Sequence, residues 1–348
     1  MNTLARDQQP ARRIPDRLPT GAGGFLGRWE TLLLAVAIAI FIANSLASPH
    51  FLDPWNLSDA TYNFTEKAMI AFAMTLLIIS GEIDLSVAAI IALASTAMGA
   101  AAQAGFSTPA LVGIGLGVGL LCGAFNGTLV ARIGLPSIVV TIGTMSLFRG
   151  IAQIVLGDQA YGGYPASFAW FGQGYMSDVS WWPALPGFEV VTFEMVAFAV
   201  SALFFGVLLH WTAFGRRIYA IGNNAAAAQF SGVKVERTKF LLFLLTGLMS
   251  GFAAVCLTSR LGSTRHTIAT GWELEVVTMA VLGGVSILGG AGTILGVVLA
   301  AIVMGLVTFG LGLLNVPGIV MSIFIGLLLI LVIALPLVVG RIRNKAVA

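Results

Sequence analysis

The side chains with the clearest capacity for chemistry interrupt an apolar run at residues 80–89, which read SGEIDLSVAA. Glu82, Asp84 and Ser86 stand there beside a glycine, with long apolar stretches on both sides. Carboxylates inside such a run are energetically unfavourable and usually face a cavity or a partner, and a helix break frees backbone groups that need a polar setting. The segment therefore predicts one of two structures. Either it lines or gates a solute pathway, or it is a short turn in which Asp84 or Ser86 caps the next helix.

A second group of polar side chains lies at residues 135–153, LPSIVVTIGTMSLFRGIAQ. Ser137, Thr141 and Thr144 follow helical spacing, so their hydroxyl groups share one face. This stripe can line a passage for a hydroxylated solute, or it can let a neighbouring helix pack closely. Arg149 is expected to reach toward the membrane surface or to pair with an acid such as Glu194.

Signatures of enzyme chemistry are missing from the sequence. It contains no G-x-x-x-x-G-K-[ST] phosphate loop, no H-E-x-x-H and no G-x-S-x-G. The three histidines, His50, His210 and His266, are far apart, and Cys122 and Cys256 both lie in apolar segments typical of buried thiols. The sequence therefore predicts no catalytic residue, no metal site and no cofactor.

The composition indicates that these polar residues belong to a membrane protein. The 348 residues are 58% hydrophobic and only 9% charged, with a mean hydropathy of +0.96, whereas soluble domains carry roughly 25% charged residues. A membrane-crossing helix needs about 20 apolar residues. We therefore predict an all-α integral membrane protein of about ten transmembrane helices, at residues 31–48, 65–80, 86–104, 109–131, 135–156, 191–210, 239–258, 275–289, 293–313 and 318–340.

Lysine and arginine placement predicts the orientation of these spans. Basic residues concentrate in the first 30 residues, in the loop 211–239, in the tail 341–348 and at Arg132. With ten spans all of these lie on one side, so both termini are predicted to be cytoplasmic. The domain plan is then a disordered arm at 1–30, a transmembrane domain at 31–340 and a tail at 341–348. The basic pI of about 9.1 reflects this topology, so no nucleic-acid partner is expected. The ten spans can also be divided into two five-helix halves of opposite orientation, an arrangement that recurs in transporters.

The predicted outer face carries its longest loop at residues 157–189, which is rich in aromatic residues. Those rings are consistent with an interfacial aromatic belt or with a docking surface for an external partner. The glycine-rich stretch LGGVSILGGAG at residues 282–292 predicts tight helix crossings, with a hinge as the second interpretation.

The loop 211–239 holds an alanine-rich insert, GNNAAAAQFSGVKVE, at residues 222–236. Asn223 or Asn224 is a suitable N-cap, and Ser231 with Gly232 is a stop signal, so the pattern predicts a short helix outside the membrane. A helix this short is marginal alone and must pack against something. Its small side chains suit a groove on another protein.

Four ordered stretches resemble one family, the permeases of ribose-, xylose-, rhamnose- and autoinducer-2-type bacterial ABC importers. They read GEIDLSVAA, GLPSIVVTIGTMSLFRGIA, FGRRIYAIGNNAAAAQFSGVKVERTKFLLFLLTGLMSGFAA and GWELEVVTMAVLGGVSILGGAGTILG, and the resemblance runs from about residue 65 to 340. The chain departs from the family pattern at Glu82, where a second glycine is usual, and at Ala225, where glutamate is frequent.

The resemblance implies a multi-pass protein of the bacterial inner membrane that imports a pentose, a rhamnose-like 6-deoxyhexose or autoinducer-2. Its expected partners are a cytoplasmic ATP-binding subunit, a periplasmic solute-binding protein facing 157–189 and 259–275, a second permease and the lipid bilayer. ATP hydrolysis is expected on the separate subunit. The ATPase-coupling residues implied are Gly222, Asn223, Asn224, Ala225, Ala226, Ala227, Ala228, Ser231, Gly232 and Val233.

One alternative of another class stays open at this point. A secondary transporter or facilitator for a small polar solute can draw on an ion gradient through Asp84, Glu82 or Glu194. It would transport without any ATPase and would depend on membrane potential or pH.

Overall fold

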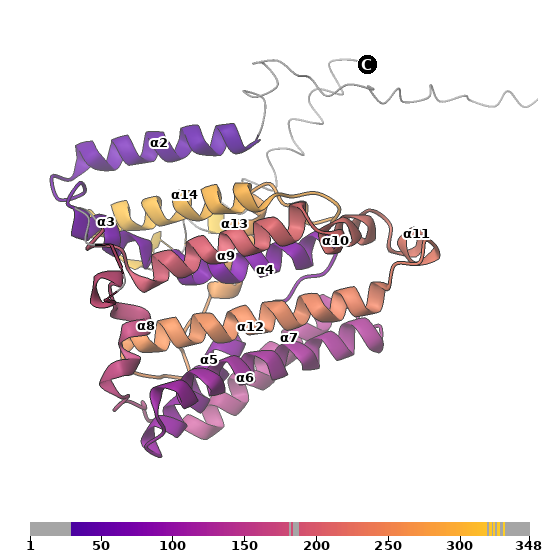
Figure 1. Ribbon diagram of the computed structural model, residues 1–348, viewed down its shortest axis with the longest axis horizontal. Coiled ribbons are helices and arrows are strands. Elements are labelled where there is room, and N and C mark those ends of the chain that lie inside the picture. The colour runs from indigo at the N-terminus through magenta and orange to yellow at the C-terminus, as the bar shows by residue number, and fades with distance from the viewer. Residues whose placement is uncertain are drawn as a thin grey trace, which may run out of the picture.

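The computed structural model describes residues 29–180, 182–183, 188–318, 320–321, 323, 326–327 and 330. These residues form a helical bundle, with isolated β-bridges joining Tyr161 to Thr264 and Tyr175 to Thr192 (Figure 1). The longer helices are α2 (Trp29–Ala47), α4 (Thr65–Ile79), α5 (Val87–Gln103), α6 (Thr108–Gly127), α7 (Ser137–Leu156), α9 (Phe193–His210), α10 (Ala213–Asn223), α12 (Val235–Leu261), α13 (Trp272–Leu282) and α14 (Ile294–Leu313). Shorter elements are α3 (Pro54–Thr61), η1 (Thr128–Arg132), η2 (Ala166–Phe168), α8 (Trp170–Gln173), η3 (Met176–Asp178) and α11 (Ala225–Phe230).

Each predicted span from 31–48 to 293–313 contains a helix, whereas 318–340 lies largely outside the described residues. By length and hydropathy, six of the described helices can cross a membrane, and α3 with α4, bent by 41°, can form a seventh crossing. The chain is therefore an all-helical membrane protein, while the count of ten remains a prediction. The span predicted at 275–289 was too long, because α13 ends at Leu282 where the glycine-rich stretch begins.

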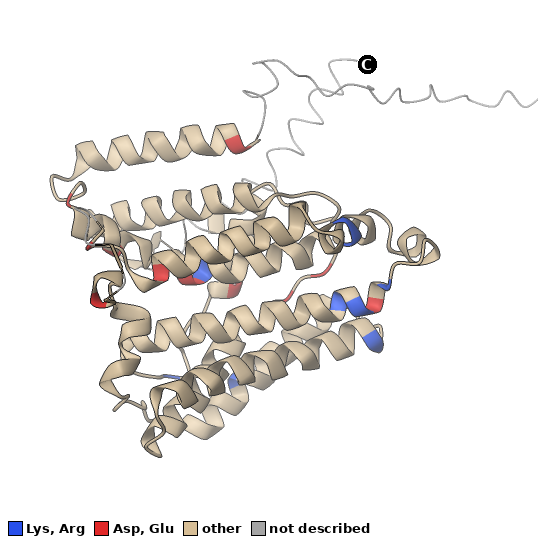
Figure 2. Cartoon of the chain, viewed as in Figure 1, with Lys and Arg blue, Asp and Glu red and all other residues tan. Residues whose placement is uncertain are grey.

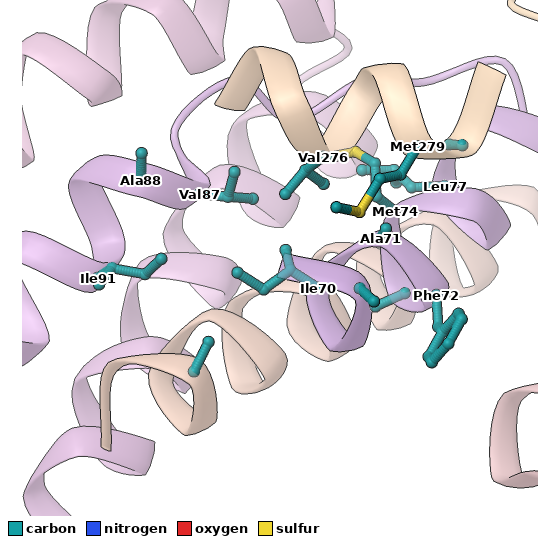
Figure 3. Close-up of a cluster of buried hydrophobic side chains, with 14 of the residues drawn as sticks. Ile70, Ala71, Phe72, Met74, Leu77, Val87, Ala88, Ile91, Val276 and Met279 are labelled. Carbon is teal, nitrogen blue, oxygen red and sulfur yellow. The ribbon is translucent and has the colours of Figure 1, made fainter. Parts of the chain in front are cut away.

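Helix α4 lies at the centre of the bundle. Every residue of α4 except Lys67 is buried, as expected of a helix that is apolar on all sides. Its Ile70, Met74 and Leu77 belong to one apolar cluster with residues of α5 and α13, as Figure 3 shows. Helices α9 and α12 pack against it as well. Helix α4 is therefore held from several directions.

The closest helix crossing joins α6 to α12 through glycines. A Cβ atom added to Gly119 would lie 2.4 Å from the Gly247 carbonyl oxygen, and one added to Gly123 would lie 2.5 Å from the Phe243 oxygen. Gly247 and Gly251 are the facing residues on α12. The two backbones are thus in direct contact, which only small residues at four-residue spacing allow.

The loops of the bundle divide between two ends. One end holds α10, α11, the beginning of α12 and the N-terminal end of α2, and basic residues gather there (Figures 1 and 2). Arg132 lies at this end too, with its guanidinium 4.7 Å from the ring of Phe240 near the start of α12. The opposite end holds the aromatic loop, where Tyr161 and Thr264 exchange backbone hydrogen bonds. This division agrees with the prediction that Arg132 and the loop 211–239 lie on the same side of the membrane. The arm before residue 29 and the tail 341–348 lie outside the described residues.

Candidate functional site

Helix α11 forms where the alanine-rich insert predicted a helix. Asn224 is the N-cap, with extended backbone and a side-chain Oδ1 that accepts a hydrogen bond from the Ala227 amide at 3.0 Å. Gly232 ends the helix with a φ of +85°, and the amide of Val233 bonds back to the Ala228 carbonyl at 3.0 Å. The predicted N-cap and stop are confirmed, so short-range signals alone determine this helix.

The outer surface of α11 has no cover within the described chain. Ala228 is buried and faces the rest of the protein, whereas Ala226 and Ala227 are exposed and Phe230 is 93% exposed. A neighbouring depression of about 310 Å³ is lined by residues from Gln229 to Arg237. A protruding aromatic ring on an uncovered helix is typical of a contact residue for a protein partner. The sequence interpretation did not include Phe230, although an aromatic beside a helix stop was its signal.

Three backbone segments meet near the end of α10, shortly before α11 in the chain. The amide of Gly290 donates a hydrogen bond to the carbonyl of Ile79, the last residue of α4, at 2.9 Å. Gly222, near the end of α10, lies so close that an added Cβ would sit 1.8 Å from that same oxygen. We call Ile79, Gly222 and Gly290 the three-backbone junction. It confirms the tight packing predicted for the glycine-rich stretch.

A tyrosine reinforces this junction. The hydroxyl of Tyr219 in α10 donates to the Gly292 carbonyl at 2.7 Å. Burial raises the pKa of the Tyr219 phenol, so the hydroxyl keeps the proton that it donates. Helix α10 leads directly into α11, with Asn224 alone between them, so α11 is joined to the junction at the end of α4 without a long linker.

The polar break between α4 and α5 has the non-helical structure that its sequence predicts. Gly81 has a φ of +87°, and residues 80–86 form turns between Ile79 and Val87. Asp84 is fully buried, and its Oδ1 accepts from the amide of Ser86 at 2.8 Å and from its hydroxyl at 2.6 Å. Asp84 therefore holds the turn that starts α5, while the Ser86 side chain makes no cap hydrogen bond.

Two residues from other helices bind side chains of the break between α4 and α5. Asn126 in α6 donates to the Ser86 hydroxyl at 2.8 Å and to Asp84 at 3.3 Å, and Glu82 forms an ion pair with Lys239 of α12. Sequence reasoning missed Asn126, whose polar amide inside an apolar span was the available signal. Lys239 lies one turn inside α12, which follows α11 in the chain. The ion pair is a second link between the break and α11.

The hydroxyl stripe of α7 packs against this break. Ser137, Thr141 and Thr144 are all buried and share a face, as predicted. The Ser137 hydroxyl accepts from the Ile83 amide at 3.4 Å, and Thr141 contacts the Ile83 carbonyl at 3.5 Å. These long bonds are weak. In this conformation the stripe contacts the backbone of the break.

Arg149 does not join this group. Its Nη1 donates to the carbonyls of His266 and Ile268 at 2.8 and 2.9 Å, so it braces the loop after α12. The predicted pairing with Glu194 is wrong, because Glu194 accepts from Thr65 at the start of α4. Backbone carbonyls of the loop accept the hydrogen bonds of the Arg149 guanidinium instead. Within the part of the chain that the structure describes, no three His, Cys, Asp or Glu side chains are grouped as metal ligands.

The ion pair between Glu82 and Lys239 leads to a charge-swap prediction. Glu82→Lys or Lys239→Glu alone should lower several-fold the solute uptake that the resemblance implies, because each places two like charges in a partly buried contact. The double change E82K/K239E should recover most of the uptake, since it restores opposite charges. Uptake assays on the three variants at matched membrane levels check this. If the double change is no better than the worse single change, the link is not electrostatic.

The sequence is similar to those of known transport permeases. The family described as branched-chain amino acid transport system / permease component matches residues 56–333. The autoinducer 2 import system permease protein LsrD of Salmonella typhimurium is 34% identical over 319 residues, which cover 90% of this chain and 91% of the relative. LsrD of Klebsiella pneumoniae is 35% identical over 311 residues, covering 88% and 90%, and LsrD of Yersinia enterocolitica is 35% identical over 319 residues, covering 90% and 91%. No solved structure gives a significant match.

Proposed function

Since this chain belongs to the family of branched-chain amino acid transport system / permease components, we propose that it is the permease subunit of an ATP-driven importer for a sugar or sugar-like solute. The observation that carries the coupling part of this proposal is the uncovered surface of α11, joined by α10 to the three-backbone junction. The chain lacks a phosphate-binding loop, so energy must come from a partner. The protein acts in the bacterial inner membrane.

Residues 222–233 dock in a cleft of a cytoplasmic ATP-binding subunit. The exposed alanines allow close approach, and the Phe230 ring supplies an apolar anchor. Basic residues around α10 and α12 keep this end on the cytoplasmic side (Figure 2). The ten spans that the sequence predicts would put the N-terminal arm and the tail on this same side.

Movement of the ATPase reaches the solute pathway by two routes. One runs from α11 through α10 to the three-backbone junction at the end of α4. The other runs through the start of α12 to the pair of Lys239 and Glu82. Both routes end at residues 79–86. We propose that this break, with Asp84, Ser86 and the α7 hydroxyl stripe, is the gate, whereas Arg149 orders the opposite end.

The opposite end receives solute from a periplasmic binding protein. The described part of the 157–189 loop is held in shape by the backbone hydrogen bonds of Tyr161 with Thr264 and by ring contacts, including Tyr164 with Phe168 at 5.1 Å and Trp170 with Phe193 at 4.8 Å. Several aromatic residues therefore face the bundle and stiffen the loop as a platform. A second permease, identical or paralogous, completes the pathway.

Because the relatives are autoinducer 2 import permeases, autoinducer-2 is favoured over a pentose or a 6-deoxyhexose as the solute. That molecule and the alternative pentoses and 6-deoxyhexoses are rich in hydroxyl groups. Buried oxygens at the break, from Asp84, Ser86 and Thr141, can accept or donate hydrogen bonds to such groups when the gate opens. The binding protein is expected to supply most of the selection.

Ala227→Asp tests the docking of α11. The change places a charge on its exposed surface, and burying that charge against a partner is unfavourable. We expect co-purification of the ATP-binding subunit to fall by at least roughly tenfold and solute-dependent ATP hydrolysis to be lost, while the permease stays folded. Ala227→Ser is the matched control and should keep both. Normal coupling in the aspartate variant would contradict docking at this helix.

A further inference from the structure

An open apolar groove lies between α9 and α14. It has a volume of about 370 Å³ and is lined by residues between Ala202 and Trp211 on one side and between Ile294 and Val298 on the other. A Cβ atom added to Gly206, within this lining, would meet nothing within 4 Å. The glycine therefore leaves space that no described residue fills, and the groove is open on the outer surface of the bundle.

The length of this groove suits one lipid chain. Helix α9 is apolar and long enough to cross a membrane. Its residues 202–211 rise about 14 Å at 1.5 Å per residue, close to half of the roughly 30 Å hydrocarbon core of a bilayer. Trp211, at the end of the groove, is 77% exposed, and indole rings favour the membrane–water interface. The groove thus extends from that interface through about one leaflet.

The Trp211 end of the groove lies beside two arginines of α10. A Cβ added to Gly215 would lie only 1.8 Å from the Leu209 carbonyl oxygen, so the first turn of α10 packs directly on the last turn of α9. Arg216 and Arg217 follow Gly215 in the chain, and both are exposed. Basic residues of α10 can be seen at this end of the bundle in Figure 2. Two guanidinium groups are therefore available at one end of an apolar groove.

These two guanidinium groups have no acidic partner. Within the described residues neither forms an ion pair, whereas Lys239 at the same end of the bundle is paired with Glu82. One carboxylate is near the groove, because Glu30 of α2 accepts a hydrogen bond at 3.0 Å from Thr293, which precedes the first residue of α14. Two positive charges and one negative charge leave this corner with a net positive charge.

We propose that the groove binds one anionic phospholipid, with an acyl chain between α9 and α14 and its phosphate at Arg216 and Arg217. The apolar lining alone would accept a chain of any lipid. The arginines supply the selection, because basic pockets between transmembrane helices favour anionic headgroups and a guanidinium forms charge-assisted hydrogen bonds with phosphate. The inference rests on the chain being a membrane protein and is independent of the proposed solute and ATP-binding subunit.

Brominated lipids test the proposal, because bromine quenches the fluorescence of a tryptophan that it contacts. The full chain is placed in phosphatidylcholine nanodiscs that contain a rising fraction of brominated phosphatidylglycerol or brominated phosphatidylcholine. The Trp211 signal is the difference between the wild type and Trp211→Phe. Half-maximal quenching should need at least roughly fivefold less of the anionic lipid, since one arginine near a membrane surface strengthens its binding about fivefold.

Two further outcomes of this titration would overturn the proposal. Equal quenching by the two lipids would show that the groove holds ordinary bulk lipid without selection. Absence of quenching by either lipid would show that protein fills the groove, from residues 318–340 or from a second copy of the chain.

Variants separate the headgroup from the chain. Arg216→Gln with Arg217→Gln should abolish the preference for phosphatidylglycerol. The matched control is Lys234→Gln with Arg237→Gln, which removes two positive charges from the depression beside α11 and should keep the preference. Gly206→Leu should fill the groove without a backbone clash and should abolish the preference with both arginines present. Preference retained after loss of the arginines, or unchanged quenching in Gly206→Leu, would contradict this site.

Discussion

Gly222→Ala is expected to reduce uptake by roughly tenfold or more, although the protein still inserts into the membrane. The added Cβ would lie 1.8 Å from the Ile79 carbonyl oxygen and 2.5 Å from the Gly290 nitrogen. These are backbone atoms, which cannot rotate away as a flexible side chain would. Forcing them apart costs about 1–3 kcal/mol, and 1.4 kcal/mol corresponds to tenfold. The change therefore separates α10 from the end of α4.

The measurement is uptake together with ATP hydrolysis by the assembled importer at matched membrane levels. Hydrolysis that continues without uptake would place the defect between α11 and the gate. Gly113→Ala is the control, because a Cβ there meets nothing within 4 Å and the residue also lies in a helix. Normal uptake by Gly222→Ala would mean that the three-backbone junction does not transmit motion.

Gly119→Leu should remove most of the folded protein. A Cβ at this position would lie 2.4 Å from the Gly247 oxygen and 2.8 Å from the Gly251 Cα, so α6 and α12 would have to separate along their whole crossing. Helix association in lipid depends on such close packing, because lipid tails offer apolar contacts of equal quality. We expect destabilisation of about 3 kcal/mol or more.

Gly117→Leu is the matched control for this crossing. Gly117 lies in the same helix two residues away, and a Cβ there meets nothing within 4 Å. Size-exclusion profiles and thermal midpoints of the two variants compare the positions directly. Similar profiles for both variants would show that the crossing tolerates separation, and Gly247→Leu should repeat the defect from the α12 side.

The features that were predicted from sequence depend on neighbours in the chain. Helix α11 follows from the Asn224 cap and the Gly232 stop, and the break follows from a glycine and carboxylates between apolar runs. Both are local, since capping and left-handed backbone involve residues a few positions apart. The family resemblance supplied the order of the elements, and the match over residues 56–333 agrees with it.

The features that were missed depend on which distant segments meet. Nothing near Gly222 indicates that its partner is the end of α4, and the Asn126 amide could not be assigned to Asp84 from spacing. The pairing of Arg149 with Glu194 was wrong for the same reason. Loop carbonyls compete with acids for an arginine, and only the packing of α7 against the loop after α12 decides between them.

The burial of every residue of α4 except Lys67 bears on how the chain is made. The helices that enclose it include α9, α12 and α13, which are translated long after it. Until these helices are made, Glu66 and Lys67 of α4 lack their ion-pair partners, because Arg260 lies in α12 and Glu275 lies in α13. Folding of the centre is thus governed by contacts of large sequence separation, which form slowly. Chains truncated before α12 should be degraded by membrane quality-control proteases, because α4 then lacks the helices that bury it. The last third of the polypeptide is thus needed to complete the packing of the first third.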